Sequence, residues 1–162
     1  AVFPGVPGGR AVIVNGPSSA GKTTVMTAVV ESALTPWVMF DELTFGSLNW
    51  AFLIWRDTAP TLAPGFAAGI TALASAGNQV ILTGTVRSLL EPLRASVPTL
   101  SVGLDCPLDV LIERQSGRDD RWGGLTEETQ RAHDGWTYDL RFDTSQVSPS
   151  QIAAEILRAA GQ

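Results

Sequence analysis

The stretch AVIVNGPSSAGKTT, residues 11–24, is the most informative part of this sequence. It begins with a short apolar, β-branched run that ends at Gly16-Pro17, a pattern typical of a buried strand entering a turn. Apolar residues then recur at helical spacing, which predicts a helix over about 22–34. Residues 16–23 match G-x-x-x-x-G-K-[ST] between that strand and that helix, which is the context that a phosphate-binding loop requires.

The chemistry of this loop follows from its residue types. Glycines let the chain curl so that backbone N–H groups at a helix N-terminus hold phosphate oxygens. Lys22, the chain's only lysine, is expected to reach the β- and γ-phosphates of ATP, and the Thr23 hydroxyl to ligate Mg²⁺. The alternative is a Gly-rich turn that precedes a helix by chance. The expected nucleotide-binding residues are Gly16, Pro17, Ser18, Ser19, Ala20, Gly21, Lys22, Thr23, Thr24 and Arg114.

The rest of the chain alternates between short apolar runs and helical patterns, which predicts an α/β protein with a five-stranded parallel sheet covered on both faces. We expect a three-layer α/β/α fold in a single domain, residues 1–162. Further strands are predicted near 37–40, 79–82, 99–105 and 138–143. Helices are predicted at about 42–56, 66–76, 87–96 and 107–116, with a short one from Thr126. A last helix is predicted from about 149, with a capping box at Ser148 and Gln151. Around them we expect a Pro/Gly-rich extension (1–10), an acceptor-pocket region (about 42–65) and an arginine-containing lid (about 114–125).

Asp41 is the candidate catalytic base, because it follows the second predicted strand at the edge where ligands bind in open α/β sheets. A carboxylate there can accept the proton of an attacking hydroxyl group. The alternative is an N-cap for the next helix, and Glu42 takes the catalytic role if the register slips by one residue.

Arg114, Arg118 and Arg121 are spaced by four and three residues, so a continuous helix would place them on one face. In a lid, Arg118 and Arg121 would stabilise the charge of phosphoryl transfer. The alternative is a set of surface ion pairs with the neighbouring acids Glu113, Asp119 and Asp120.

Residues 45–55 are rich in aromatic side chains, and Trp50 and Trp55 are expected to bind an apolar acceptor unless they only pack the core. The third predicted strand ends in Thr83-Gly84, where many P-loop enzymes carry an acid that helps to hold Mg²⁺. Either Thr83, Asp41 and waters complete the metal shell, or the protein binds nucleotide with weakened catalysis.

Composition excludes several other classes of protein. The formal charge of −5 and a pI near 4.7 argue against a nucleic-acid partner. The apolar stretches are too short to span a membrane, and we expect a cytoplasmic protein. The sequence has one cysteine, Cys106, and one histidine, His133, which excludes an intrachain disulfide framework and a zinc-binding cluster. Neither residue is assigned a role. The oligomeric state stays open.

Beyond the loop, several short motifs occur in an order and spacing that resemble the chloramphenicol phosphotransferase family, small P-loop kinases of the nucleoside-monophosphate-kinase type. The resemblance implies a three-layer α/β/α P-loop kinase fold with a five-stranded parallel sheet, and ATP-dependent phosphorylation of a small-molecule hydroxyl group. It places the base at Asp41 and lid arginines at Arg118 and Arg121. This sequence departs from the family at Thr83-Gly84 and in a shorter segment after Asp41, so the acceptor stays open. The matching residues are Asn15-Gly16, Ser18 to Lys22, Pro36-Trp37, Phe40-Asp41, Cys106, Arg114, Arg118, Arg121, His133 to Gly135, Tyr138-Asp139 and Asp143-Thr144.

The leading hypothesis is therefore a kinase that phosphorylates a hydroxyl group of a small molecule, such as an antibiotic. Two alternatives remain. A nucleoside or nucleotide kinase of the same fold would need a polar pocket for a base, and a nucleotide-binding switch with little turnover would explain the missing acid at Thr83.

Overall fold

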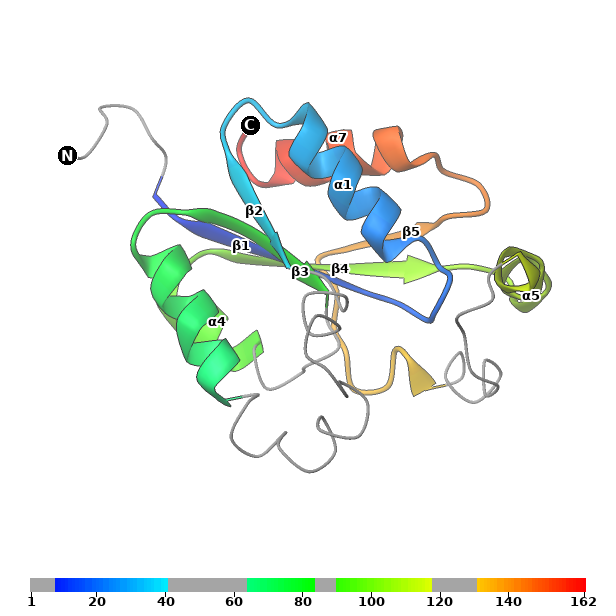
Figure 1. Ribbon diagram of the computed structural model, residues 1–162, viewed down its shortest axis with the longest axis horizontal. Helices are drawn as coiled ribbons and strands as arrows, with labels where there is room; N and C mark the ends of the chain where they lie inside the picture. Colours follow the sequence, from blue (N-terminus) through cyan, green and yellow to red (C-terminus); the bar gives the residue numbers. More distant parts are fainter. Residues whose placement is uncertain (1–7, 41–63, 84–89, 118–130) are drawn as a thin grey trace.

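The computed structural model describes residues 8–40, 64–83, 90–117 and 131–162 (Figure 1). The helices expected over 42–56 and from Thr126 lie outside these residues. The strands are β1 (Arg10–Asn15), β2 (Trp37–Phe40), β3 (Gln79–Thr83), β4 (Thr99–Asp105) and β5 (Leu140–Asp143), and the helices are α1 (Lys22–Ser32), α4 (Leu90–Ser96), α5 (Leu108–Ser116), α7 (Pro149–Ala159) and one at 64–75.

The five strands form one parallel sheet in the order β2-β3-β1-β4-β5. This confirms the predicted α/β fold. β1 lies in the middle, with Val12 beside Ile81 of β3 and Asn15 beside Gly103 of β4. The loop that follows β1 therefore leaves the sheet at the centre of its carboxyl edge.

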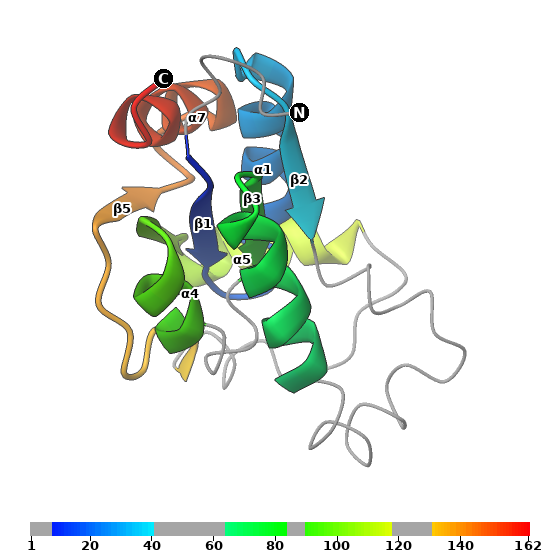
Figure 2. The same cartoon turned by 90° about the vertical axis from the view of Figure 1, so that its left-hand side faces the viewer.

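Alternating side chains of β1 supply the two cores of the molecule. Val12 and Val14 pack with α1 and α7 on one face, while Ala11 and Ile13 pack with helix 64–75 and α4 on the other. Both views show this three-layer arrangement (Figures 1 and 2). Because a strand buried on both faces is continuously apolar, the run at 11–14 marks a central strand.

Most predicted boundaries are confirmed to within two residues. The expected helix over 22–34 ends at Ser32, and α7 begins at Pro149 with the predicted capping box, in which the Ser148 hydroxyl accepts from the backbone N–H of Gln151. Pro107 is the N-cap of α5 and so precedes its first helical residue.

The last strand is shorter than expected at its start, and a side chain explains the difference. β5 begins at Leu140, because the Asp139 carboxylate accepts a hydrogen bond of 2.7 Å from the backbone N–H of Ser101. The Asp139 side-chain oxygen thus accepts the hydrogen bond from Ser101 that a backbone carbonyl oxygen would accept in a regular parallel ladder. Within the described residues, no helix is long and apolar enough to cross a membrane.

Candidate active site

The loop between β1 and α1 is held in a tight curl. A Cβ atom at Gly16 would lie 2.5 Å from the carbonyl oxygen of Leu104, so the chain passes β4 at a distance that only glycine permits. Ser19 and Gly21 both have positive φ angles, 64° and 96°. Gly21 is the N-cap of α1 and makes no side-chain capping bond. The N–H groups of the first helical turn are therefore directed into the loop, where they can bind an anion.

Lys22 lies at the centre of this curl. Its Nζ donates hydrogen bonds to the carbonyl oxygens of Gly16 (2.8 Å) and Pro17 (3.1 Å). The ammonium group is thus held beside the backbone atoms that begin the loop, within reach of a phosphate group bound there.

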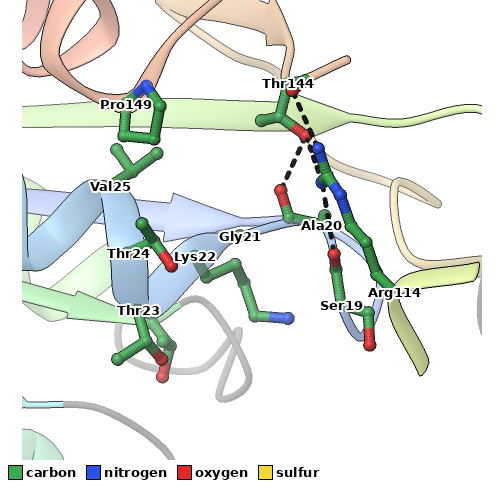
Figure 3. A pocket seen from close by; sticks show the side chains of 11 residues that line it. Ser19, Ala20, Gly21, Lys22, Thr23, Thr24, Val25, Arg114, Thr144 and Pro149 are labelled. Carbon is green, nitrogen blue, oxygen red and sulfur yellow. Dashed lines mark hydrogen bonds between the residues drawn. The ribbon is translucent and has the colours of Figure 1, made fainter. Parts of the chain in front are cut away.

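A pocket of about 400 Å³ opens in front of the loop (Figure 3). Thr23 and Thr24 of α1 and Thr83 at the end of β3 contribute hydroxyl groups to it. Thr83 is only 8% exposed. The lining residues are Ser19, Ala20, Gly21, Lys22, Thr23, Thr24, Val25, Thr83, Arg114, Thr144 and Pro149.

Arg114 and Thr144 form the far wall of this pocket. The Arg114 guanidinium donates to Thr144 Oγ1 and to the Thr144 carbonyl, both at 3.0 Å, and reaches the Ser19 carbonyl at 3.4 Å. The Thr144 hydroxyl donates to the carbonyl of Ala20 at 2.8 Å. These hydrogen bonds join α5 and the segment after β5 to the loop between β1 and α1, as the dashed lines in Figure 3 show.

Charged groups gather around Asp105, the last residue of β4. The Arg141 guanidinium binds Asp105 through two hydrogen bonds, of 2.5 and 2.8 Å, which hold the pKa of that carboxyl below its usual value. His133 Nε2 lies 3.3 Å from the same carboxylate. Burial nevertheless lowers the pKa of His133, with smaller contributions in the same direction from the charges of Arg141 and Lys22. The imidazole is therefore neutral near pH 7.

Of the predicted nucleotide-binding residues, Arg114 and those from Ser19 to Thr24 line the pocket. Gly16, Pro17 and Ser18 are not among its lining residues, although the carbonyl oxygens of Gly16 and Pro17 accept hydrogen bonds from Lys22. Asp41, Trp50, Trp55, Arg118 and Arg121 lie outside the described residues, although Asp41 directly follows β2. α5 ends at Ser116 with Gly117 as its C-cap, so the described helix carries Arg114 but does not extend to Arg118.

Sequence reasoning did not assign Thr144 and Pro149 to the site. Both residues follow the last strand, and the carboxyl ends of parallel strands meet at one edge of the sheet. Thr144 also belongs to the Asp143-Thr144 motif that carries part of the family resemblance. No group of three or more His, Cys, Asp and Glu residues that could hold a metal occurs among residues 8–40, 64–83, 90–117 and 131–162.

Gly16→Ala is expected to weaken ADP binding. The new methyl group would have to displace backbone atoms of β4, and overpacking of this kind costs about 1–3 kcal/mol. Since about 1.4 kcal/mol corresponds to a tenfold change, we expect an affinity about tenfold lower by isothermal titration calorimetry. Gly117→Ala is the matched control, because a Cβ there meets no atom within 4 Å. Equal affinities of Gly16→Ala and the wild type would contradict the tight passage at β4.

Comparison with protein families adds an independent finding. A family described as chloramphenicol phosphotransferase-like protein matches residues 9–160. No curated protein matches the chain.

Solved structures with a similar fold include kinases and a resistance protein. A sugar kinase from Janibacter sp. is 21% identical over 93% of each chain, with a TM-score of 0.64. The tunicamycin resistance protein of Deinococcus radiodurans is 18% identical, covers 94% of this chain and 96% of its own, and has a TM-score of 0.68. The Mycobacterium tuberculosis APS kinase CysC, solved with AMPPNP and APS, is 19% identical over 96% and 99% of the two chains, with a TM-score of 0.64.

Proposed function

Since this chain belongs to the chloramphenicol phosphotransferase-like family, we propose that it transfers the γ-phosphoryl group of ATP to a hydroxyl group of a small molecule. The observation that carries the proposal is the pocket in front of the phosphate loop. Its lining combines the Lys22 ammonium group, the open first turn of α1 and the Arg114 guanidinium in one concave space. Such a pocket is suited to a polyanion at one end and a larger organic group at the other.

The phosphate end of the nucleotide would lie on the loop. Backbone N–H groups of residues 18–23 would bind the β-phosphate oxygens, and Lys22 would exchange a loop carbonyl for a β- or γ-phosphate oxygen. Arg114 and Thr144 would contact the other end of the nucleotide, because they line the same pocket beside Ser19 and Ala20.

The hydroxyl groups of Thr23 and Thr83 line one pocket and are hard oxygen ligands of the kind that Mg²⁺ prefers. Thr23 would hold the ion directly, and the remaining positions would be filled by phosphate oxygens and waters, which Mg²⁺ retains readily. Bound there, Mg²⁺ would neutralise the charge that develops between the β- and γ-phosphates.

Asp41 is the proposed base. In the transfer step, the acceptor oxygen forms a bond to the γ-phosphorus while the bond from that phosphorus to the β–γ bridging oxygen breaks. The acceptor's proton passes to the Asp41 carboxylate, and ADP leaves. Arg118 and Arg121 would stabilise the transferring group, and Trp50 and Trp55 would contact the acceptor.

One observation favours a second candidate, a nucleotide-binding switch with weak turnover. Thr83 occupies the end of β3, and no acidic side chain is among the described residues that line the pocket. With one metal-holding carboxylate fewer, nucleotide binding would persist while chemistry slows.

A screen of acceptors separates these functions. The purified protein is incubated with Mg²⁺, ATP and a panel of hydroxyl-bearing antibiotics and nucleosides, and each acceptor is analysed by mass spectrometry. One phosphoryl group gained by an antibiotic would support the resistance-type kinase, and one gained by a nucleoside would move the proposal to the nucleoside kinases. ATP binding without any phosphorylated acceptor would favour the switch.

A further inference from the structure

We propose that His133 and Tyr138 are positioning residues for the phosphate loop, because they hold the side chain of Asn15, the residue that precedes Gly16. The inference rests on the proposed function, since it assigns how that nucleotide site is kept in shape. Neither side chain lines the pocket, so both would act through Asn15.

Asn15 is the last residue of β1 and is only 7% exposed. Its Nδ2 donates hydrogen bonds to the Ala132 carbonyl oxygen and to the Tyr138 hydroxyl, both at 2.7 Å. Both amide hydrogens of Asn15 therefore take part in hydrogen bonds. The next residue in the chain is Gly16, whose carbonyl oxygen binds Lys22. A shift of Asn15 would thus be passed to the start of the loop and to its lysine.

The Tyr138 ring has little freedom to move. It stacks on Trp136 with a centroid distance of 5.9 Å and an interplanar angle of 6°. On another side it lies against Gly103, where a Cβ atom would approach the ring carbons to 2.7 Å. A phenol held in this way presents its oxygen at a fixed point beside Asn15.

The hydrogen-bond pattern defines the state of His133. Because the Tyr138 oxygen accepts from Asn15, its single proton is directed to His133 Nδ1, which lies 2.7 Å away. We assign His133 the tautomer with an unprotonated Nδ1, because it gives the phenol proton an acceptor and places the ring proton on Nε2, which faces Asp105. Both ring nitrogens have partners, so His133 holds Tyr138 rather than acting as a base.

Protonation of His133 would disturb this chain of bonds. An imidazolium Nδ1–H would become a second donor toward the Tyr138 oxygen, and the phenol proton would lose its acceptor. The charged groups that face His133 are Asp105 from β4, Arg141 from β5 and Lys22 from α1. Burial opposes protonation of His133 most strongly; the Asp105 carboxylate favours protonation, and the smaller effects of the Arg141 and Lys22 charges oppose it. The neutral ring therefore prevails near pH 7, and its hold on Tyr138 is lost as the pH falls through a pKa below the usual value.

The test is the affinity for ADP, measured by isothermal titration calorimetry in the full chain. At pH 8 we expect Tyr138→Phe and His133→Phe to bind ADP about tenfold more weakly, the factor that about 1.4 kcal/mol represents. Tyr138→Phe removes one oxygen and keeps the ring that covers Gly103. His133→Asn is expected to bind within about twofold of the wild type, because its Oδ1 replaces Nδ1 as the acceptor for Tyr138. Asp134→Asn, an exposed neighbour, is the control.

A titration from pH 8 to pH 5.5 supplies the readout that a purely structural role would not change. The phosphates of ADP titrate in the same range, so the wild type is compared with His133→Asn at each pH. The ratio of the wild-type affinity to the His133→Asn affinity should decrease as the pH is lowered, because His133 becomes charged in the wild type only. Circular dichroism checks that each variant is folded.

Wild-type affinity in both Tyr138→Phe and His133→Phe would overturn the inference, as would a ratio that stays constant with pH. Both results leave the proposed function standing. Failure of the wild type itself to bind ADP would instead contradict the proposed function, and the two failures are therefore distinguishable.

Discussion

Replacing Lys22 by methionine is expected to lower the rate of phosphoryl transfer by about 10³-fold, because the transferring group loses an ammonium group aimed at its developing charge. The chain has no other lysine that could substitute. Methionine keeps most of the unbranched apolar stem of the side chain and removes its ammonium group.

The Lys22→Met variant also loses the bonds from Nζ to the Gly16 and Pro17 carbonyl oxygens. Circular dichroism and thermal unfolding must therefore show a folded protein before the rate is interpreted. Arg131→Met, which removes an exposed cation outside the pocket, is the matched control and should retain the wild-type rate. Transfer by Lys22→Met at the wild-type rate would remove Lys22 from the mechanism.

Replacing Asp41 by asparagine is expected to reduce turnover by about 10²- to 10⁴-fold while ADP affinity stays within about twofold of the wild type. The amide is nearly isosteric with the carboxylate, but it cannot accept the proton of the acceptor hydroxyl group. Turnover is followed by coupled ADP release with an acceptor identified in the screen, and binding by calorimetry.

Glu42→Gln is the matched control for Asp41, because it removes the neighbouring carboxylate. If Asp41 is the base, Glu42→Gln should retain most of the activity. Loss of turnover in Glu42→Gln alone would transfer the role to Glu42. Unchanged turnover in both variants would contradict a carboxylate base after β2.

The fold could be predicted largely from local patterns. β2 occupies Trp37–Phe40 as expected, since a short apolar run between Pro36 and a polar residue leaves little choice of boundary. The capping box at Ser148 and Gln151 depends on residues three positions apart and was equally visible. The order of the strands in the sheet could not be predicted, because an alternation of strands and helices does not indicate on which side of β1 each new strand is added.

The site was predictable where its residues are adjacent in sequence. The phosphate loop is one continuous motif, and its position between β1 and α1 is confirmed. The contacts that brace it are long-range: Arg114 binds Thr144, and Asn15 binds Tyr138. No period or spacing in the sequence links such pairs, so the neighbouring acids of Arg114 were the only partners that sequence could suggest. Tyr138 has its position because Gly103 leaves room for its ring, a complementarity that exists only in the folded chain.

The most direct test of the account follows the phosphoryl group itself. ATP labelled with ¹⁸O on the non-bridging oxygens of its γ-phosphate is incubated with the protein, Mg²⁺ and the acceptor panel, and the products are analysed by mass spectrometry. We expect the wild type, and not Lys22→Met, to form ADP and an acceptor that carries one labelled phosphoryl group. Labelled inorganic phosphate alone, or bound and unchanged ATP with every acceptor, would contradict transfer to a hydroxyl group.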